Sequence, residues 1–356
     1  MTRALVTGAG PVAGAVDPGG PVPAVAREVA EVIAGECGLP FLPEPAGGDP
    51  RATALGRTFA LLSEIDAGLA GEPHGGRWAI GGQRSGVAGV SQLVRTTRRM
   101  LRDDLDVLAE ACAGDPSRSF LIRLTGPITF AATVVDRRGR TLLADPVARA
   151  DIATALTEAL LLGVTLAAST VAGRGGIVLL LDESALAGVL TGQARASALT
   201  VADPISPERL IALLEPAVRA VAGAAATDKV VLDVGATAGA LAVGLAANPG
   251  GMLLPVDRAH TVALDALTCA LDAGVHVLGT VLTTAADVRD PGLIATRVRR
   301  SMRTVGLPDE SVPERVWLAD DPSVPPALAV VQSLTCLRAA ADRLSAIGEP
   351  VLAPGS

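Results

Sequence analysis

One pattern repeats from end to end of this chain: a short run rich in leucine and β-branched residues ends in a polar residue, and a stretch of helical length follows it. The expected strands lie at 4–7, 77–80, 120–125, 177–182, 230–233, 252–257, 275–281 and 315–320. Several of these runs, such as IVLLLDE and VVLDVG, are almost continuously apolar, which is typical of strands covered on both faces. The alternation of such strands with helices predicts a parallel sheet.

Eight strand–helix units in 356 residues favour a closed barrel over an open, doubly wound sheet. The expected helices lie at 22–34, 51–69, 91–113, 146–171, 207–225, 260–273, 292–305 and 325–347. No linker, charge block or internal repeat divides the chain, so we predict one domain over residues 1–356, with the first strand and loop, residues 1–50, packing on the barrel. The predicted fold class is therefore α/β, a single (β/α)8 TIM barrel.

The composition argues against several classes of protein. With 30 basic and 37 acidic residues the formal net charge is −7, which opposes binding to nucleic acid. Apolar stretches are interrupted before they reach about 18 residues, so we expect no membrane span. The four cysteines form no CxxC pair and the first 21 residues do not resemble a signal peptide, which indicates a cytoplasmic protein with reduced thiols.

Polar side chains stand at the C-terminal ends of the expected strands, where barrel enzymes place their sites. These residues are Thr7, Thr125, Asp182, Glu183, Asp233, Asp257, Thr280, Asp320 and Asp321. Six carboxylates at one opening would raise one another's pKa unless a cation lay among them, which suggests a site for a hard divalent cation or for a cationic substrate. The alternative is that several of them cap the N-terminus of the helix that follows.

Three segments resemble the catalytic half of cobalamin-independent methionine synthase, in the superfamily that also contains uroporphyrinogen decarboxylase. LTGPITF at 124–130 is similar to the LTGPVT strand and loop of that family, and LLDESAL at 180–186 is similar to its DEPAL segment. RVWLADD at 315–321, with the long helix after it, resembles the closing strand. In addition, GLPFLPEPAGG…GR at 38–57 is similar to a LPxLPELPxRGxxxxxxGR stretch of short actinobacterial relatives.

The resemblance covers nearly the whole chain, and it implies a TIM barrel of the same superfamily. In the family the aspartate of the DEPAL segment contacts the amino group of homocysteine, which implies a substrate-binding role for Asp182. We extend that expectation to Glu183 and to the turn formed by Thr125 and Gly126. If the chain is an active enzyme, the resemblance implies S-methyl transfer.

The zinc ligands of the family are missing at the matching positions. The resemblance implies a His-x-Cys pair on the fifth strand, a glutamate on the sixth and a cysteine after the eighth, which hold zinc and activate a thiolate. Here the corresponding residues are Leu232, Val234, Pro255 and Pro322. Leucine and valine cannot bind a metal, and Asp257 could replace the glutamate only after a shift in register. We therefore expect neither zinc nor another cofactor, unless the acidic strand ends hold a hard divalent cation.

Three hypotheses for function remain. The first is a divergent barrel without zinc chemistry that binds a small, amino-acid-like molecule or acts as a non-catalytic partner of another protein. The second is an enzyme of altered mechanism, in which the carboxylates listed above bind a divalent cation or act as general acid and base. The third is a structural or interaction protein. An open mouth would favour the first two hypotheses, whereas a mouth filled by arginine or leucine side chains would favour the third.

Overall fold

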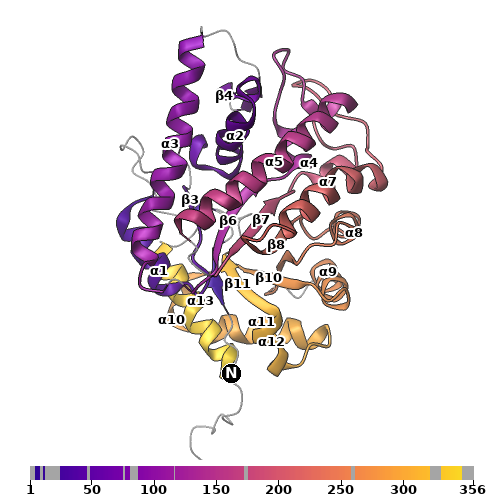
Figure 1. Ribbon diagram of the computed structural model, residues 1–356. Helices are drawn as coiled ribbons and strands as arrows, with labels where there is room; N and C mark the ends of the chain where they lie inside the picture. Colours follow the sequence, from indigo (N-terminus) through magenta and orange to yellow (C-terminus); the bar gives the residue numbers. More distant parts are fainter. Residues whose placement is uncertain are drawn as a thin grey trace, which may run out of the picture.

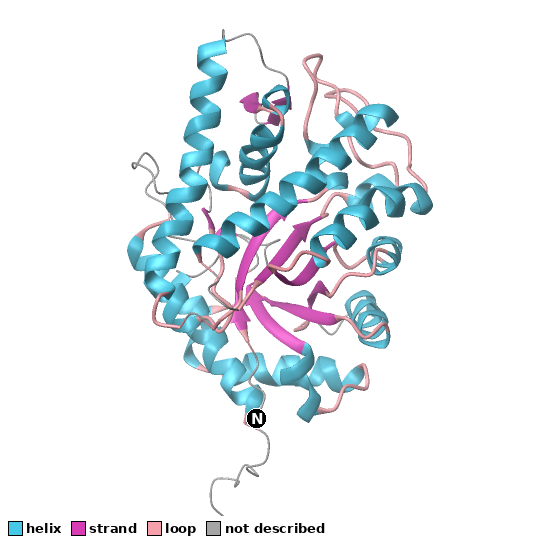
Figure 2. Cartoon of the chain, viewed as in Figure 1, coloured by secondary structure: helices cyan, strands magenta, loops and turns pink. Residues whose placement is uncertain are grey.

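Parallel strands form one curled sheet, and helices surround its outer side (Figure 1; Figure 2). The computed structural model describes residues 5–8, 11–12, 25–45, 49–74, 77–80, 87–115, 117–171, 175–257, 261–320 and 330–346. Within these residues the sheet has seven strands in the order β1-β11-β10-β9-β8-β7-β6. The fold is thus an α/β fold whose parallel sheet is curved like part of a barrel.

The strands of this sheet agree closely with those expected from the sequence, with one exception. They are β1 (Val6–Thr7), β6 (Phe120–Thr125), β7 (Ile177–Asp182), β8 (Thr227–Asp233), β9 (Gly251–Pro255), β10 (His276–Val281) and β11 (Val316–Asp320). All pairs of neighbours are parallel. The apolar runs that predicted a parallel sheet therefore form it.

The exception is the strand expected at 77–80, which does not belong to the main sheet. It forms β5 (Arg77–Ile80) and pairs in antiparallel fashion with β4 (Gly71–His74) in a separate two-stranded sheet. The backbone of Val135 bonds to it, receiving a hydrogen bond from Ile80 and donating one to Trp78, both at 2.9 Å. The strand pattern at 77–80 was therefore read correctly, but its place in the fold was predicted wrongly.

Segment 39–42 contacts both edge strands of the main sheet. The N–H of Leu39 donates to Val6 O in β1 at 3.1 Å. On the other side, Leu121 N–H in β6 donates to Pro40 O at 2.7 Å, and Leu42 N–H donates to Leu121 O at 3.0 Å. Proline has no N–H, so Pro40 within the segment and Pro43 directly after it interrupt the strand pattern. For this reason the sequence did not predict a strand here.

Long helices pack on the convex side of the sheet (Figure 1). They are α1 (Arg27–Glu36), α2 (Ala54–Ile65), α3 (Val87–Cys112), α5 (Pro146–Thr170), α7 (Pro207–Ala222), α8 (Ala238–Ala246), α9 (Thr261–Asp272), α11 (Gly292–Thr304) and α13 (Val330–Ser345). Shorter elements near the strand ends are β2 (Pro11–Val12), β3 (Glu44–Pro45), α4 (Pro127–Thr133), α6 (Leu186–Leu190), α10 (Ala285–Arg289) and α12 (Val312–Arg315). Each helix expected from the sequence has a counterpart whose ends differ by a few residues, and the expected positions 22–24, 260, 325–329 and 347 lie outside the described residues.

Helix α5 shows how the outer layer is built. Its first turn is capped by Asp145, whose Oδ1 accepts the N–H groups of Val147 at 2.9 Å and Ala148 at 3.2 Å. Among the described residues it is the helix long and apolar enough to cross a membrane, judged by length and composition alone. Here it packs against α2 and α7 and lies on strands β6 and β7, as a core helix does.

The packing of α5 also fixes which side chains of β6 face outward. A Cβ atom added at Gly163 of α5 would lie 2.9 Å from Leu124 Cδ1 and 2.8 Å from Leu61 Cδ1. Leu124 therefore points toward the helices. Because side chains alternate along a strand, its neighbours Arg123 and Thr125 point to the concave side of the sheet.

Candidate functional site

Arg123 occupies the middle of the otherwise apolar strand β6 and reaches across the concave side of the sheet. Its Nη2 lies 2.9 Å from Asp233 Oδ2 and 3.1 Å from Asp182 Oδ2. Asp182 ends β7 and Asp233 ends β8, so the guanidinium spans from β6 to β8 past the strand between them. Only 10% of the Arg123 side chain is exposed. The positive charge that the acidic strand ends require is thus supplied, in part, by the chain itself.

Glu44 joins this group from β3, which follows segment 39–42. Its Oε1 lies 3.8 Å from Arg123 Nε, is buried, and accepts no hydrogen bond from any described residue. Arg57 of α2, itself fully buried, holds the two residues before β3 in place by donating to the carbonyls of Leu42, at 3.2 Å, and Pro43. We call Glu44, Arg123, Asp182 and Asp233 the mouth cluster.

The mouth cluster keeps its arginine charged. Burial by itself would lower the pKa of Arg123, but the carboxylates of Asp182, Asp233 and Glu44 outweigh it and raise that pKa above its ordinary value. Asp182 also accepts the N–H of Ser184 on Oδ1 at 3.0 Å, so it combines an ion pair with a local turn contact. About a sixth of its side chain, 17%, remains accessible. The cluster therefore presents fixed charges of both signs to anything that enters the concave side.

Glu183, which follows Asp182, points away from the mouth cluster into the protein. Its two carboxyl oxygens accept the N–H groups of Ile128 at 3.1 Å and Thr129 at 2.7 Å, at the N-terminus of α4. Burial raises the pKa of Glu183 to about 8, although these backbone hydrogen bonds act to lower it. Glu183 therefore accepts hydrogen bonds at the N-terminus of α4. A contact of Glu183 with substrate stays a prediction.

The turn of Thr125 and Gly126 fits against this buried carboxyl group. A Cβ atom at Gly126 would lie 2.3 Å from Glu183 Oε1, so a larger residue there would displace the buried carboxyl group. The Gly126 N–H donates to Asp182 O at 3.0 Å, and Thr125 N–H donates to Thr58 Oγ1 at 2.9 Å. The turn thus positions the end of β6 beside the end of β7.

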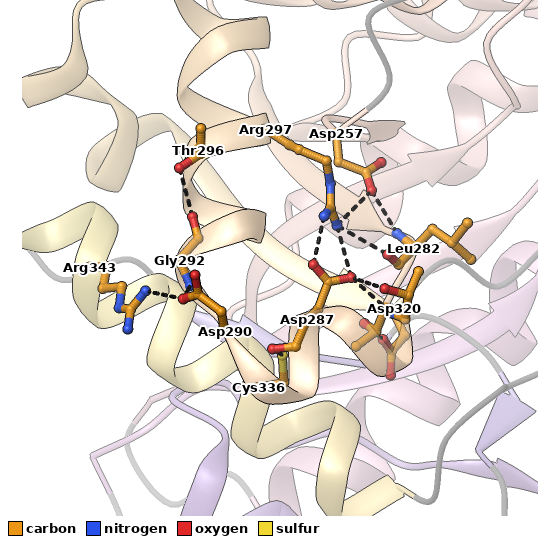
Figure 3. Close-up of polar contacts among 12 residues, drawn as sticks. Asp257, Leu282, Asp287, Asp290, Gly292, Thr296, Arg297, Asp320, Cys336 and Arg343 are labelled. Atoms are coloured by element: carbon orange, nitrogen blue, oxygen red, sulfur yellow. Dashed lines mark hydrogen bonds and ion pairs between the residues drawn. The ribbon is translucent and has the colours of Figure 1, made fainter.

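A second arginine, Arg297 of α11, holds a separate acidic group (Figure 3). Its Nη1 lies 2.6 Å from Asp287 Oδ1, and its Nη2 lies 3.5 Å from Asp257 Oδ2. Asp287 is fully buried and closes the capping box of α10 with Thr284. Burial opposes ionisation of Asp287, but the hydrogen bonds from Arg297 and Thr284 lower its pKa below the ordinary value. Asp257 also accepts the N–H of Leu282 at 3.0 Å.

Asp320, at the end of β11, is tied to its own neighbourhood. It accepts hydrogen bonds from Ser333 Oγ of α13, at 2.6 Å to each oxygen, and from Thr283 Oγ1 at 2.8 Å. Asp321 lies outside the described residues. The predicted carboxylates are therefore brought together in part. Asp182 and Asp233 share Arg123, whereas Asp257 and Asp320 bond to residues that follow β10 and to helices α11 and α13.

The described residues contain no group of three or more His, Cys, Asp and Glu side chains placed to hold a metal ion. Leu232 and Val234 are fully buried, Pro255 ends β9, and Pro322 lies outside the described part of the chain. The absence of zinc stays a prediction. Sequence reasoning missed Glu44, Arg123 and Arg297, although an arginine inside the apolar strand FLIRLT was a visible signal.

Comparison with known proteins assigns the chain to no family. No protein-family model matches the chain, and no curated protein matches it. The solved structures that resemble it include a B12-independent methionine synthase from Shewanella sp. W3-18-1 in complex with selenomethionine, with 14% sequence identity and a TM-score of 0.44. The match covers 68% of this chain and 66% of that one. The class defined by the structure is an α/β protein with a curled parallel sheet, consistent with a TIM-like barrel.

Proposed function

We propose that this chain is a closed (β/α)8 barrel, similar in type to cobalamin-independent methionine synthase, whose mouth binds a small molecule through an ammonium group. Support for closure comes from segment 39–42, which hydrogen-bonds to both edge strands of the sheet. In a closed barrel the C-terminal ends of the strands surround one opening, and the mouth cluster lies at that opening. We further propose that the protein is cytoplasmic.

The observation that carries the proposal is the buried Oε1 of Glu44, which accepts no hydrogen bond from the described residues. A buried carboxylate oxygen without a donor is costly, and such groups in native proteins call for a missing partner. An ammonium group carries three N–H donors and a positive charge. An amino-acid-like ligand would also bring a carboxylate, which the guanidinium of Arg123 can bind.

The proposed activity is binding, without the thiolate chemistry of the family that the chain resembles. Leucine and valine stand where zinc ligands would be needed, and their side chains cannot donate to a metal. The mouth cluster has the groups for orienting a zwitterion, namely one cation and three carboxylates from four different segments of the chain.

Thermal melts with matched ligands test this function. L-methionine should raise the Tm, whereas its analogue without the amino group, 4-(methylthio)butanoate, should not, because a ligand that binds only the folded state must stabilise it. Glu44→Gln should weaken the affinity for L-methionine, obtained from the concentration dependence of the Tm, at least tenfold, since a charge-assisted hydrogen bond contributes about 1.5–3 kcal/mol. Glu215→Gln, on the exposed face of α7, is the control. Equal shifts from both ligands, or none from any amine tried, would contradict the proposal.

A structural or interaction protein is the second candidate, and one observation favours it. The Arg123 side chain occupies the concave side and already bonds Asp182 and Asp233, as expected of a mouth closed by its own side chains. In that case no amine shifts the Tm, and changes in the mouth cluster alter stability alone. The alternative with a divalent cation predicts instead that Mg²⁺, Ca²⁺ or Mn²⁺ raises the Tm.

A further inference from the structure

A row of small side chains lies on the strands that follow the mouth cluster around the sheet. The strand register pairs Thr7 of β1 with Ala319 of β11, and it pairs Ala319 with Thr280 of β10. Because paired residues of neighbouring parallel strands point to the same face, these three side chains share one side of the sheet. We call Thr7, Ala319 and Thr280 the threonine row.

The register also shows to which side the threonine row points. Leu124 points toward the helices, and the pairing from β6 to β9 places Met252 on that same face. A Cβ atom at Gly244 of α8 would lie 3.1 Å from Met252 Cε, in agreement with this direction. Pro255, three positions after Met252, therefore points to the concave side, and it pairs with Thr280. The threonine row thus lies on the concave side, as the mouth cluster does.

The hydroxyl groups of the threonine row lack partners among the described residues. Thr7 is fully buried, and its Oγ1 makes no hydrogen bond with them. Thr280 is 4% exposed, and its hydroxyl bonds to none of them either. Thr58, which is also fully buried, instead donates to Ala54 O at 2.8 Å and accepts the N–H of Thr125 at 2.9 Å. Since buried polar groups in native proteins are hydrogen-bonded, the hydroxyl of Thr7 indicates a partner that a ligand supplies.

Charge is distributed unevenly around the concave side. The mouth cluster brings charged side chains from β3, β6, β7 and β8, whereas the threonine row on β10, β11 and β1 is uncharged. Asp320, which follows Ala319, does not join the row, because it accepts hydrogen bonds from Ser333 of α13. Ala319 places only a methyl group between the two threonines. A ligand held by its charged groups at the mouth cluster would therefore meet an uncharged, hydroxyl-bearing wall with its remaining part.

We propose that the ligand is an amino acid whose neutral side chain ends in a hydroxyl or amide group, and that this group hydrogen-bonds to Thr7 and Thr280. The inference rests on the proposed function, because it concerns the other end of the same ligand. A hydroxyl or amide group both donates and accepts hydrogen bonds, as the threonine hydroxyls do. An apolar side chain would leave the hydroxyl of Thr7 unpaired, and a charged one would lose its hydration without a counter-ion in the threonine row.

Two matched pairs of amino acids test this preference. L-homoserine and L-norvaline have side chains of equal length, and homoserine alone carries a hydroxyl group. L-glutamine and L-homoleucine differ in the same way at an amide group. Affinities come from the concentration dependence of the Tm. We expect the polar member of at least one pair to bind about tenfold more tightly or better, because the apolar member leaves buried hydroxyls unpaired.

Threonine-to-valine variants assign the preference to the threonine row. Thr7→Val and Thr280→Val keep the shape of the side chain and should each reduce the ratio of the two affinities. Thr154→Val is the control, because Thr154 is exposed on α5 and donates to Ala150 O at 3.1 Å; it should leave the ratio unchanged. A ratio that survives both Thr7→Val and Thr280→Val would overturn the proposal.

A second measurement needs no ligand. Thr7→Val removes a buried hydroxyl that lacks a partner, so it should raise the Tm of the ligand-free protein, whereas Thr58→Val removes a bonded hydroxyl and should lower it. A lower Tm for both variants would show that Thr7 is already bonded, and would overturn the proposal.

The outcomes separate this inference from the proposed function. If both members of each pair raise the Tm with equal affinity, the mouth binds amino acids without a polar preference, and the inference alone is wrong. If neither these four amino acids nor L-methionine raises the Tm, the proposed function fails and the inference fails with it.

Discussion

At the scale of single residues, Arg123 has the largest expected effect on stability. Replacing it with methionine leaves the carboxylates of Glu44, Asp182 and Asp233 facing one another without the guanidinium. Breaking a buried ion pair from one side costs about 3–5 kcal/mol, and we expect Arg123→Met to destabilise the protein by that amount at neutral pH.

Urea denaturation measures this change in the free energy of unfolding. The control is Arg219→Met, because Arg219 is exposed and its ion pair with Glu215 lies on the surface of α7; we expect that change to be within about 0.5 kcal/mol. The penalty of Arg123→Met should shrink in acid, where the carboxylates protonate. If Arg123→Met and Arg219→Met have the same free energy of unfolding, the ion pairs of the mouth cluster do not contribute to stability.

Glu183 gives a prediction for pH dependence. Its pKa is about 8 in the folded protein and 4.5 ordinarily, so between these values the folded protein holds a proton that the unfolded chain has released. The contribution of Glu183 is therefore complete below the ordinary pKa and is lost as the pH rises toward the folded value. Glu183→Gln cannot ionise and should remove this part of the decline. The free energies of unfolding of the wild-type protein and of Glu183→Gln, measured across this pH range, test the prediction. If both fall equally with rising pH, the prediction is contradicted.

At the scale of secondary-structure elements, close packing between α5 and β6 explains a glycine inside a helix. Gly163→Ala would bring a Cβ atom to within 3 Å of both Leu61 and Leu124. We expect it to destabilise the protein by about 1–3 kcal/mol, because overpacking outweighs the gain in helix propensity.

Gly35→Ala in α1 is the matched control, because nothing lies within 4 Å of the added Cβ atom there. It should stabilise the protein by about 0.5–1 kcal/mol, as expected for alanine in place of glycine in an exposed helix. Melting curves of the two variants should therefore shift in opposite directions. Shifts of the same sign would show that the contact at Gly163 is less tight than described.

The elements also show which parts of the fold the sequence reveals. Uninterrupted apolar runs such as 120–125 and 177–182 predict buried parallel strands because both faces are covered. Segment 39–42 escaped prediction because Pro40 within it and Pro43 directly after it break the strand pattern. Its role also depends on hydrogen bonds to β1 and β6, which no local pattern records. The run at 77–80 has the pattern of a strand, but the pattern does not identify the strand with which it pairs.

The candidate site was predictable to a similar degree. The position of polar residues at strand ends predicts that Asp182 and Asp233 lie close together, because parallel strands bring their C-terminal ends to one edge, and in the structure they share Arg123. Their cation was not predictable in the same way. Arg123 and Asp233 are 110 residues apart, and only the curvature of the sheet brings them to 2.9 Å.

At the scale of the whole molecule, the proposed closure of the barrel predicts the pattern of hydrogen exchange. The amide of Leu39 donates to β1, that of Leu42 donates to β6, and that of Leu121 donates to segment 39–42, so in a closed barrel they open only with the whole sheet. We expect their protection to match that of amides in β7. Exchange faster by several orders of magnitude at these three positions would indicate an open sheet with a loosely held segment.

The most direct test of the central claim is a crystal structure of the protein grown with the amine that raises its Tm most, with zinc also present in the medium. We expect the ligand nitrogen at hydrogen-bond distance, about 2.7–3.2 Å, from Glu44 Oε1, beside Arg123 and Asp182. A tetrahedral zinc ion bound at the ends of β8, β9 and β11, or an amine bound away from the mouth cluster, would contradict it.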